Sequence, residues 1–138
     1  GPSLKRIEPI NRRRKFETRV APDLKPLKCD GPLAVQALAN ILHNSVVHTA
    51  ESEKIEIHVS NGQDGMVEIQ VNDNGPGLPK GNPNIVFDKF YRSRPESNEG
   101  VGLGLSIARG FVEAQGGRLF AANRAGGGAV FTMLLPAG

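Results

Sequence analysis

Val67-Glu-Ile-Gln-Val-Asn-Asp-Asn-Gly-Pro-Gly77 is the stretch that decides the fold, because an alternating strand runs directly into a glycine-rich turn. The alternation places Val67, Ile69 and Val71 on one face of that strand. Asp73 continues the series, so we expect its carboxylate on the buried side at the end of the strand. A buried carboxylate needs partners that offset its lost hydration. Taken alone, a turn-forming aspartate before Asn-Gly is the simpler interpretation.

The same periodicity predicts helices and strands on both sides of this stretch. Apolar residues recur at helical spacing after Asp30, which has the character of a helix N-cap. A second helix begins at a glycine-rich run and stops at Gly116, a residue typical of helix ends. The predicted strands cover residues 15–20, 27–30, 55–60, 67–72, 118–123 and 129–135, and the predicted helices run from 30 to 48 and from the glycine run 100–104 to about 115.

Four polar side chains follow one stripe of the first predicted helix. Gln36, Asn40, Asn44 and His48 are each four residues apart and therefore stack on one side. Amides are poor helix formers, and these have no packing to gain there. Two amides beside an apolar face indicate a function for this stripe.

The run Gly100-Val-Gly-Leu-Gly104 at a predicted helix start is a second candidate site. Free backbone N–H groups and the positive end of a helix bind anions such as phosphate. The run is not the dinucleotide-binding fingerprint, since no strand leads into it and its third glycine comes one residue early. It is not a P-loop, because the chain has no Gly-Lys-Ser/Thr triplet. On its own, a plain glycine-rich linker is an equal alternative.

Length and composition limit the class of protein. The chain has 138 residues, of which 38% are apolar and 22% charged, as expected for one soluble domain. No apolar run approaches the roughly 20 residues of a membrane-spanning helix. The single cysteine, Cys29, excludes an internal disulfide framework and a zinc site built from cysteines, and it suits a reducing compartment. We interpret it as a small, partly buried apolar residue.

The net charge of +3 hides an asymmetry along the chain. Residues 1–30 contain nine Lys or Arg and four Asp or Glu, whereas residues 31–138 contain eight and ten. No aromatic side chains lie between the arginines at 12–14 to stack on bases, so a solvated linker is favoured over a nucleic-acid site. Gly1-Pro2 has the character of an expression scar. We therefore interpret residues 1–14 as scar and linker from an upstream domain.

Four motifs occur in a fixed order along the chain. They are Asn40-Ile-Leu-His-Asn44, Asp73-Asn-Gly-Pro-Gly77, Phe87-Asp-Lys-Phe90 and Gly100-Val-Gly-Leu-Gly-Leu105. In this order they resemble the N box, first glycine box, F box and second glycine box of bacterial sensor histidine kinases. The resemblance covers residues 16–136. Its run from 87 to 117 is most similar to the KdpD branch, which controls potassium uptake.

The resemblance implies the ATP-binding catalytic domain of such a kinase at residues 15–138. Its fold would be the Bergerat (GHKL) fold shared with gyrase B, Hsp90 and MutL, an α/β two-layer sandwich. In this fold a mixed sheet is covered on one face by helices, and ATP lies between the helices under a mobile lid. Residues 80–100, which are polar and rich in Gly, Pro and Ser, are the expected lid.

Residue roles carry over where the motifs match. Asp73 would accept the exocyclic amine of adenine, and Gly75 and Gly77 would let the backbone pass close to the base. Asn44 would give a carbonyl oxygen to Mg²⁺, which needs few protein ligands, and Asn40 lies one turn nearer the phosphates. The other expected nucleotide contacts are phosphate contacts from Arg92, Gly100, Gly102, Leu103 and Gly104, and lid hinges at Phe87 and Phe90.

Three positions of the first helix depart from the family pattern. His43 stands where many members have Glu, and Val47 and His48 stand where they have Lys and Tyr. His48 could stack on adenine or lie on the surface, and His43 could orient water around Mg²⁺ or merely be solvated. Asn40, His43 and Asn44 are nevertheless the expected catalytic residues. The departures bear on the efficiency of phosphoryl transfer and not on nucleotide binding.

Asn40 distinguishes a kinase from an ATPase of the same superfamily. The resemblance implies Glu at this position in the ATPases, where it activates water, and an amide has no such basicity. Phosphoryl transfer depends mostly on positioning and charge neutralisation. We therefore expect transfer of the γ-phosphoryl group of Mg-ATP to a histidine on a separate domain. His43, His48 and His58 lack the sequence context of a phosphoacceptor.

The same resemblance implies the partners. They are the protein's own upstream dimerisation and phosphoacceptor domain and a downstream response regulator, with no nucleic acid and no membrane contact by this domain. The chain alone would be a monomer, and the full-length kinase a homodimer in the inner membrane with this domain in the cytoplasm. Two alternatives stay open: a degenerate nucleotide-binding module without phosphoryl transfer, and a serine kinase of the anti-sigma type, against which the F box and long lid argue.

Overall fold

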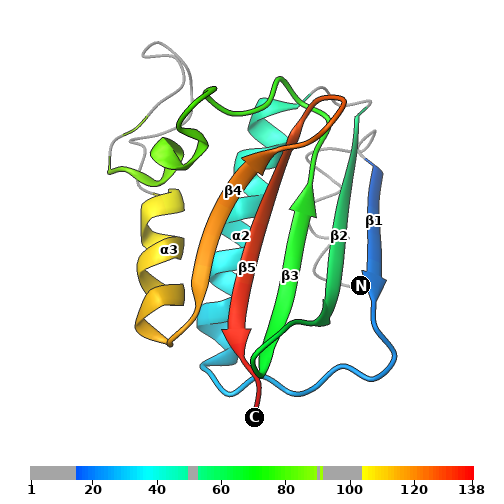
Figure 1. Cartoon of the computed structure of the whole chain (residues 1–138), viewed down its shortest axis with the longest axis vertical. Coiled ribbons are helices and arrows are strands. Elements are labelled where there is room, and N and C mark those ends of the chain that lie inside the picture. The colour runs from blue at the N-terminus through cyan, green and yellow to red at the C-terminus, as the bar shows by residue number, and fades with distance from the viewer. Residues whose placement is uncertain (1–14, 50–52, 90, 92–103) are drawn as a thin grey trace.

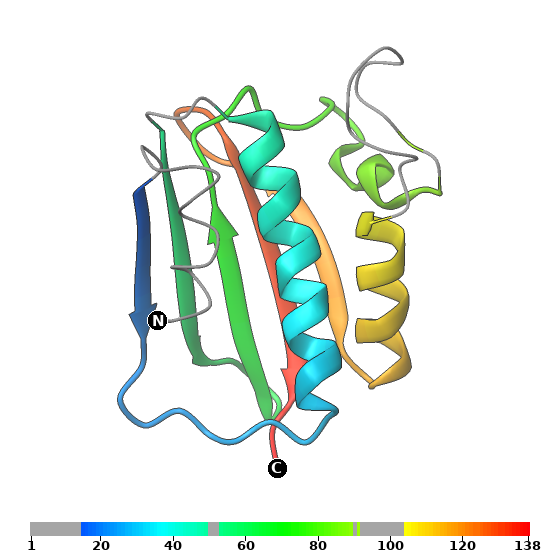
Figure 2. The same ribbon diagram turned by 180° about the vertical axis from the view of Figure 1, so that it is seen from behind.

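A five-stranded sheet forms one layer of the protein and two helices form the other. The computed structural model describes residues 15–49, 53–89, 91 and 104–138. Figure 1 shows the sheet in front, and Figure 2 shows helices α2 (Gly31–His48) and α3 (Gly104–Ala114) packed on its opposite face. The expected two-layer α/β sandwich, with helices on one face only among these residues, is confirmed.

The sheet is mixed, as expected. Its strands follow the spatial order β1-β2-β3-β5-β4. β1 and β2 are parallel, whereas the other neighbouring pairs are antiparallel. A parallel pair needs a long crossover, and α2 lies in that connection. The strand bounds are β1 (Lys15–Val20), β2 (Lys54–Asn61), β3 (Met66–Asn72), β4 (Arg118–Asn123) and β5 (Ala129–Pro136).

Local sequence explains where α2 begins. Oδ1 of Asp30 accepts a hydrogen bond from the backbone N–H of Leu33 at 3.0 Å, as the predicted N-cap should. Such a cap typically contributes about 1 kcal/mol. Pro32 occupies the first turn, where its missing N–H leaves no helical bond unmade. Further along this helix, Asn40 of the amide stripe contacts Gly104 of α3.

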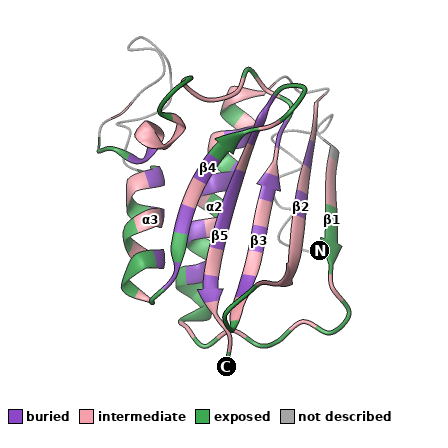
Figure 3. Cartoon of the chain, in the orientation of Figure 1, coloured by how far each residue is buried: buried purple, intermediate pink, exposed green. Residues whose placement is uncertain are grey.

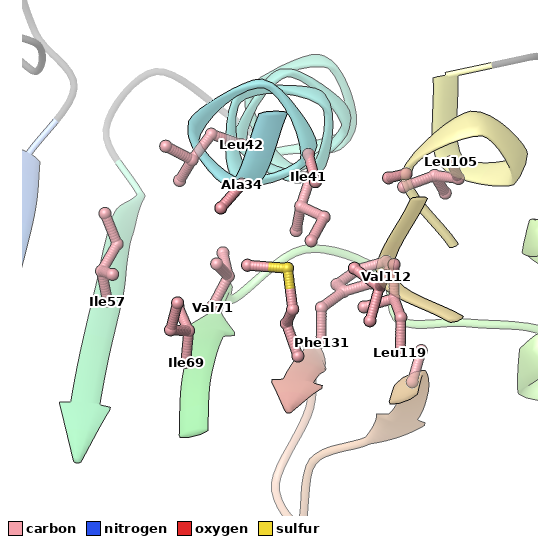
Figure 4. Close-up of a cluster of buried hydrophobic side chains, with 14 of the residues drawn as sticks. Ala34, Ile41, Leu42, Ile57, Ile69, Val71, Leu105, Val112, Leu119 and Phe131 are labelled. Carbon is pink, nitrogen blue, oxygen red and sulfur yellow. The ribbon is translucent and has the colours of Figure 1, made fainter. Parts of the chain in front are cut away.

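The hydrophobic core fills the space between the two layers. Alternate strand residues point toward the helices, so buried and half-buried positions alternate along β3 and the first half of β2 in Figure 3. In Figure 4, Phe131 and Leu119 of the sheet lie opposite Ile41 and Leu105 of the helices. Burying one such side chain stabilises the fold by about 1.5–3 kcal/mol. This core fixes α2 and α3 against the sheet.

The structure corrects one local prediction and adds detail to a second. Residues 27–30 form no strand but a single bridge between Leu27 and Ala137, because β5 ends at Pro136 and offers no longer ladder. Part of the expected lid has regular structure. It forms the 3₁₀ helix η1 (Pro83–Phe87), which begins at a proline and ends at a buried aromatic ring.

The composition-based predictions for Cys29 and for membrane spans can be compared with the fold. Cys29 is half-buried, and burial, with a smaller contribution from Asp30, raises the pKa of its thiol. The thiol therefore stays protonated near neutral pH and packs as a small apolar group. Neither helix in the described ranges combines the length and apolarity needed to cross a bilayer.

Candidate functional site

A pocket opens between α2, the end of β3 and the start of α3. The hollow is partly open, and its empty space of about 840 Å³ includes solvent at the mouth. Its apolar wall includes Leu78, Val86, Leu105 and Phe131. An apolar pocket with a few convergent polar groups is typical of a small-ligand site. The residues predicted for the site that line this pocket are Asn40, His43, Asn44, His48, Asp73, Gly77 and Gly104.

Asp73 lies at the pocket end of β3. It is only 4% exposed, which confirms the orientation predicted from strand parity. Its Oδ1 accepts hydrogen bonds from the backbone N–H groups of Gly75 (3.0 Å) and Ala129 (3.2 Å). Its Oδ2 accepts from the hydroxyl of Ser45 at 3.3 Å. These donors offset the lost hydration, and a carboxylate oxygen has capacity for a further donor from the pocket.

The two glycines after Asp73 meet different steric demands. A Cβ at Gly75 would lie 2.8 Å from the carbonyl oxygen of His48 and 2.9 Å from Cγ2 of Thr49. The close approach at Gly75 is therefore to the end of α2, and Gly75 is absent from the pocket lining. Gly77 lines the pocket and has a φ of +88°, which favours glycine. Both residues let the turn pass between α2 and the sheet.

Asn40 joins α2 to α3. Its Nδ2 donates to the carbonyl oxygen of Gly104 at 3.0 Å, and its Oδ1 accepts from Nε2 of Gln36 at 3.1 Å. Both ends of the amide are thus engaged, and the first turn of α3 is held at the pocket edge. Asn44 lies one turn further along the same stripe and is half-buried in the pocket lining.

The chemistry of Asn44 suits Mg²⁺. This ion prefers oxygen ligands, keeps several waters and is often bound through one or two protein groups together with substrate phosphates. The amide of Asn44 makes no hydrogen bond to the other described residues, so its carbonyl oxygen is available to an ion in the pocket. The residues present therefore fit a Mg²⁺ ion held partly by a ligand, with Asn44 as the protein group.

His43 and His48 both line the pocket, at different exposures. His48 is half-buried, so its side chain is not fully solvated, and its stacking on adenine stays a prediction. His43 is exposed in the pocket lining, and this position agrees both with a role in orienting water around Mg²⁺ and with a merely solvated side chain. Val47 is 41% exposed and also lines the pocket. An apolar side chain thus stands at the position where the resemblance implies Lys.

Phe87 is packed between the sheet and α3. It is 3% exposed, and its ring meets that of Phe131 edge to face with centroids 6.0 Å apart. The guanidinium of Arg109 lies 5.3 Å from the centroid of the Phe87 ring. The amide of Asn84 exchanges two hydrogen bonds with the backbone of Ala121, at 2.8 and 3.2 Å. Phe87 is therefore an anchor of η1 in this structure, and hinge motion at this position stays a prediction.

Comparison with known proteins identifies the family. The sequence profile described as histidine kinase-, DNA gyrase B- and HSP90-like ATPase matches residues 29–138. The chain belongs to this family. It is 46% identical over 110 residues to the sensor protein KdpD of Escherichia coli (strain K12), a match that covers 78% of the chain and 12% of KdpD. The chain thus spans about an eighth of the length of that relative.

Solved histidine kinases share the fold. The mycobacterial sensor histidine kinase MprB superposes with a TM-score of 0.83 at 27% identity, over 99% of this chain and 90% of that one. Full-length ShkA in complex with AMPPNP superposes with a TM-score of 0.83 at 26% identity, over 96% of this chain and 28% of that one. ThkA in complex with the response regulator TrrA superposes with a TM-score of 0.77 at 26% identity, over 98% of this chain and 37% of that one. The chain is therefore a catalytic domain of the histidine kinase type with the predicted GHKL fold.

Several residues that the kinase motifs predict for the site lie outside the described part of the chain. Of the second glycine box, the structure describes Gly104 and Leu105, which both line the pocket. The phosphate contacts and the lid order predicted for the rest stay predictions. The predicted site residues that lie outside the described ranges are Phe90, Arg92, Gly100, Gly102 and Leu103.

Three residues that shape this kinase-type site were not predicted. Ser45 is 0% exposed and donates to Asp73, and the one available signal was a hydroxyl within an apolar helical series. Asn123 bonds the backbone of Leu78, and Arg124 bonds the backbone of Asp73. Their partners lie 45 and 51 residues away along the chain, so local sequence gives no signal for either contact.

Proposed function

We propose that this domain binds Mg-ATP in the pocket and transfers its γ-phosphoryl group to a histidine on a separate dimerisation and phosphotransfer domain. The buried carboxylate of Asp73 carries the proposal, because its Oδ2 can accept a further hydrogen bond from a ligand. The exocyclic amine of adenine offers such a donor, whereas guanine presents a carbonyl oxygen at that position. The AMPPNP complex of ShkA supports an adenine nucleotide.

The residues of the pocket would bind and orient the nucleotide. Asp73 would accept the adenine amine, while Leu78, Val86 and Phe131 exclude water from around the base. Asn40 would keep the first turn of α3 close to the phosphates through its bond to Gly104. Mg²⁺, when bound, would neutralise phosphate charge. The amide oxygen of Asn44 would hold the ion on the α2 side.

Asn40 favours phosphoryl transfer over hydrolysis. An amide cannot take a proton from water, and both ends of this amide are engaged in hydrogen bonds. Transfer needs orientation of the γ-phosphorus toward the acceptor rather than a base on this domain. An imidazole nitrogen of the acceptor histidine would form the N–P bond as the bond to ADP breaks.

The wider context is proposed from the relatives. Similarity to KdpD supports potassium-responsive or osmotic two-component signalling, and the ThkA–TrrA complex supports a response regulator as the downstream partner. Within that scheme, residues 15–138 are the catalytic domain and 1–14 the linker. The full-length protein would be a homodimeric kinase of the inner membrane with this domain in the cytoplasm.

A degenerate nucleotide-binding module is the second candidate function. The observation that favours it is the pocket lining itself, where exposed His43 and Val47 replace the expected Glu and Lys. Such a module would bind Mg-ATP and regulate a partner without transferring phosphate. The two candidates therefore agree on binding and differ only in transfer.

Transfer to the kinase's own helical hairpin domain, added in trans with labelled Mg-ATP, tests the first candidate against the second. We expect acid-labile, base-stable label on the hairpin and none on the catalytic chain alone. Asn44→Asp should lower the rate of transfer while nucleotide still binds, because it alters the Mg²⁺ ligand. ATP binding without label on the hairpin supports the degenerate module. Rapid phosphate release by the chain alone would identify an ATPase instead.

A further inference from the structure

The turn between β4 and β5 holds the segment that follows Asp73. Oδ1 of Asn123 accepts from the backbone N–H of Leu78 at 2.6 Å, and Nδ2 of Asn123 donates to the carbonyl oxygen of Leu78 at 3.1 Å. One side chain thus makes both hydrogen bonds that a neighbouring strand would make, although Leu78 lies in no strand. The position of Leu78 is therefore fixed by Asn123.

Arg124 holds the other end of the same segment. Its Nη1 donates to the carbonyl oxygen of Asp73 and to Oδ1 of Asn74, each at 2.9 Å. The backbone of Asp73 also pairs with Ala129, since its N–H donates to the Ala129 carbonyl oxygen at 2.9 Å. An added Cβ at Gly128 would collide with the Asp73 carbonyl, so the turn lies directly against this backbone.

Between these two contacts, Gly75 lies against the end of α2 and Leu78 packs in part against the core, while residues 76–78 border open space. On one side, Pro76, Gly77 and Leu78 line the nucleotide pocket. On the other side, the same residues line a second, open hollow together with Lys80, Asn123 and Arg124. Figures 1 and 2 place the β4–β5 turn at the same end of the sheet as the end of β3. Because residues 76–78 border a hollow on each side, the hydrogen bonds from the turn constrain the segment where packing does not.

We propose that Asn123 and Arg124 are positioning residues for the nucleotide. They hold the segment 73–78 in the shape that receives the adenine ring, although neither side chain needs to contact the ligand. The inference rests on the proposed binding of ATP in this pocket. Losing either residue lets the segment sample other shapes, so that only a fraction of the domain is competent to bind and the apparent affinity falls by that fraction.

Asn61 provides a matched control for Asn123. Its Oδ1 accepts from the N–H of Lys25 at 3.0 Å and its Nδ2 donates to the carbonyl oxygen of Asp23 at 2.9 Å. This is the same two-bond bridge from an asparagine to a backbone segment, and neither Asn61 nor the segment that it holds lines the pocket. Asn61→Ala and Asn123→Ala should therefore lower the stability of the domain to a similar extent. If Asn123→Ala acted on ATP binding only through stability, Asn61→Ala would weaken ATP binding equally.

Calorimetric titration of the chain with ATP, well below the unfolding temperature of every variant, is the test. We expect Asn123→Ala to weaken ATP binding at least about fivefold, as the loss of two hydrogen bonds allows, and Asn61→Ala to leave it unchanged. Equal weakening by both variants, or wild-type affinity in Asn123→Ala, would overturn the inference.

Arg124 is tested by comparing two replacements. Arg124→Met removes both hydrogen bonds and should weaken ATP and ADP binding by the same factor, because the contact acts on the base and not on the phosphates. Arg124→Lys keeps a donor and should restore part of the affinity. A change confined to ATP would contradict the inference. No ATP binding by the wild-type chain would instead refute the proposed function, and this separates the two failures.

Discussion

Asp73 combines deep burial with unused capacity to accept a hydrogen bond. Two backbone N–H groups bind Oδ1, and a single hydroxyl, from Ser45, binds Oδ2. A buried carboxylate without donors would cost several kcal/mol, so this set of partners is what allows the charge to face an apolar pocket. Oδ2 then favours a ligand that donates a hydrogen bond over a ligand that can only accept one.

Replacing Asp73 with Asn tests this distinction. The amide oxygen can keep the two backbone hydrogen bonds, so the fold should survive, but an NH₂ group then faces the adenine amine. A hydrogen bond to a charged group contributes about 1.5–3 kcal/mol, so we expect ATP affinity to fall by about 10- to 150-fold in calorimetry. The control is Asp64→Asn in the exposed β2–β3 turn, which should bind ATP normally. Unchanged affinity in Asp73→Asn would remove its proposed role.

Residue-level features were predictable where they depend on local pattern. Strand parity predicts the burial of Asp73, and helical spacing predicts the stripe of Asn40 and Asn44. The contacts of Asn123 and Arg124 were not predictable, because strand order alone brings their turn beside residues 73–78. No local rule places a hairpin turn against a segment about 50 residues earlier.

At the scale of elements, η1 is fixed to both neighbouring layers. Phe87 inserts between Phe131 of β5 and Arg109 of α3, and Asn84 pairs with the outer edge of β4 at Ala121. Composition predicted a mobile segment here, because Gly, Pro and polar residues dominate residues 80–100. Residues 83–87 nevertheless form η1, where the burial of Phe87 and the hydrogen bonds of Asn84 offset part of the chain entropy. The mobility of the segment without nucleotide stays a prediction.

Replacing Phe87 with Leu tests the anchoring of η1. We expect the free energy of unfolding to fall by about 1–2 kcal/mol, because the edge-to-face pair and ring volume are lost. Amide hydrogen exchange in residues 83–89 should accelerate more than in α2. Phe120→Leu is the matched control, since Arg118 lies 5.2 Å from that half-buried ring and Phe120 alternates with the buried Leu119 and Ala121, which places it on the opposite face of β4. Equal acceleration in both variants would contradict an anchoring role for Phe87.

At the scale of the molecule, the pocket depends on tertiary structure that joins distant segments. α2, the end of β3, η1 and the start of α3 each supply part of its wall. The order of motifs indicated the fold through resemblance, and the structure confirms the mixed sheet with helices on one face. The parallel pairing of β1 with β2 had no local sequence signal, because it depends on a crossover of more than 30 residues.

Ligand binding to a pocket built from so many elements should stabilise the whole domain, and thermal unfolding with nucleotide measures this. A ligand at 100 times its Kd stabilises the native state by about 2.7 kcal/mol. For a domain of this size, that corresponds to a rise in Tm of about 8–13 °C. We expect this rise with Mg-ATP, a smaller one when EDTA removes Mg²⁺, and little with GTP, whose carbonyl oxygen would face Asp73. An equal rise with GTP would show that the pocket does not select its base through Asp73, even if it binds phosphates.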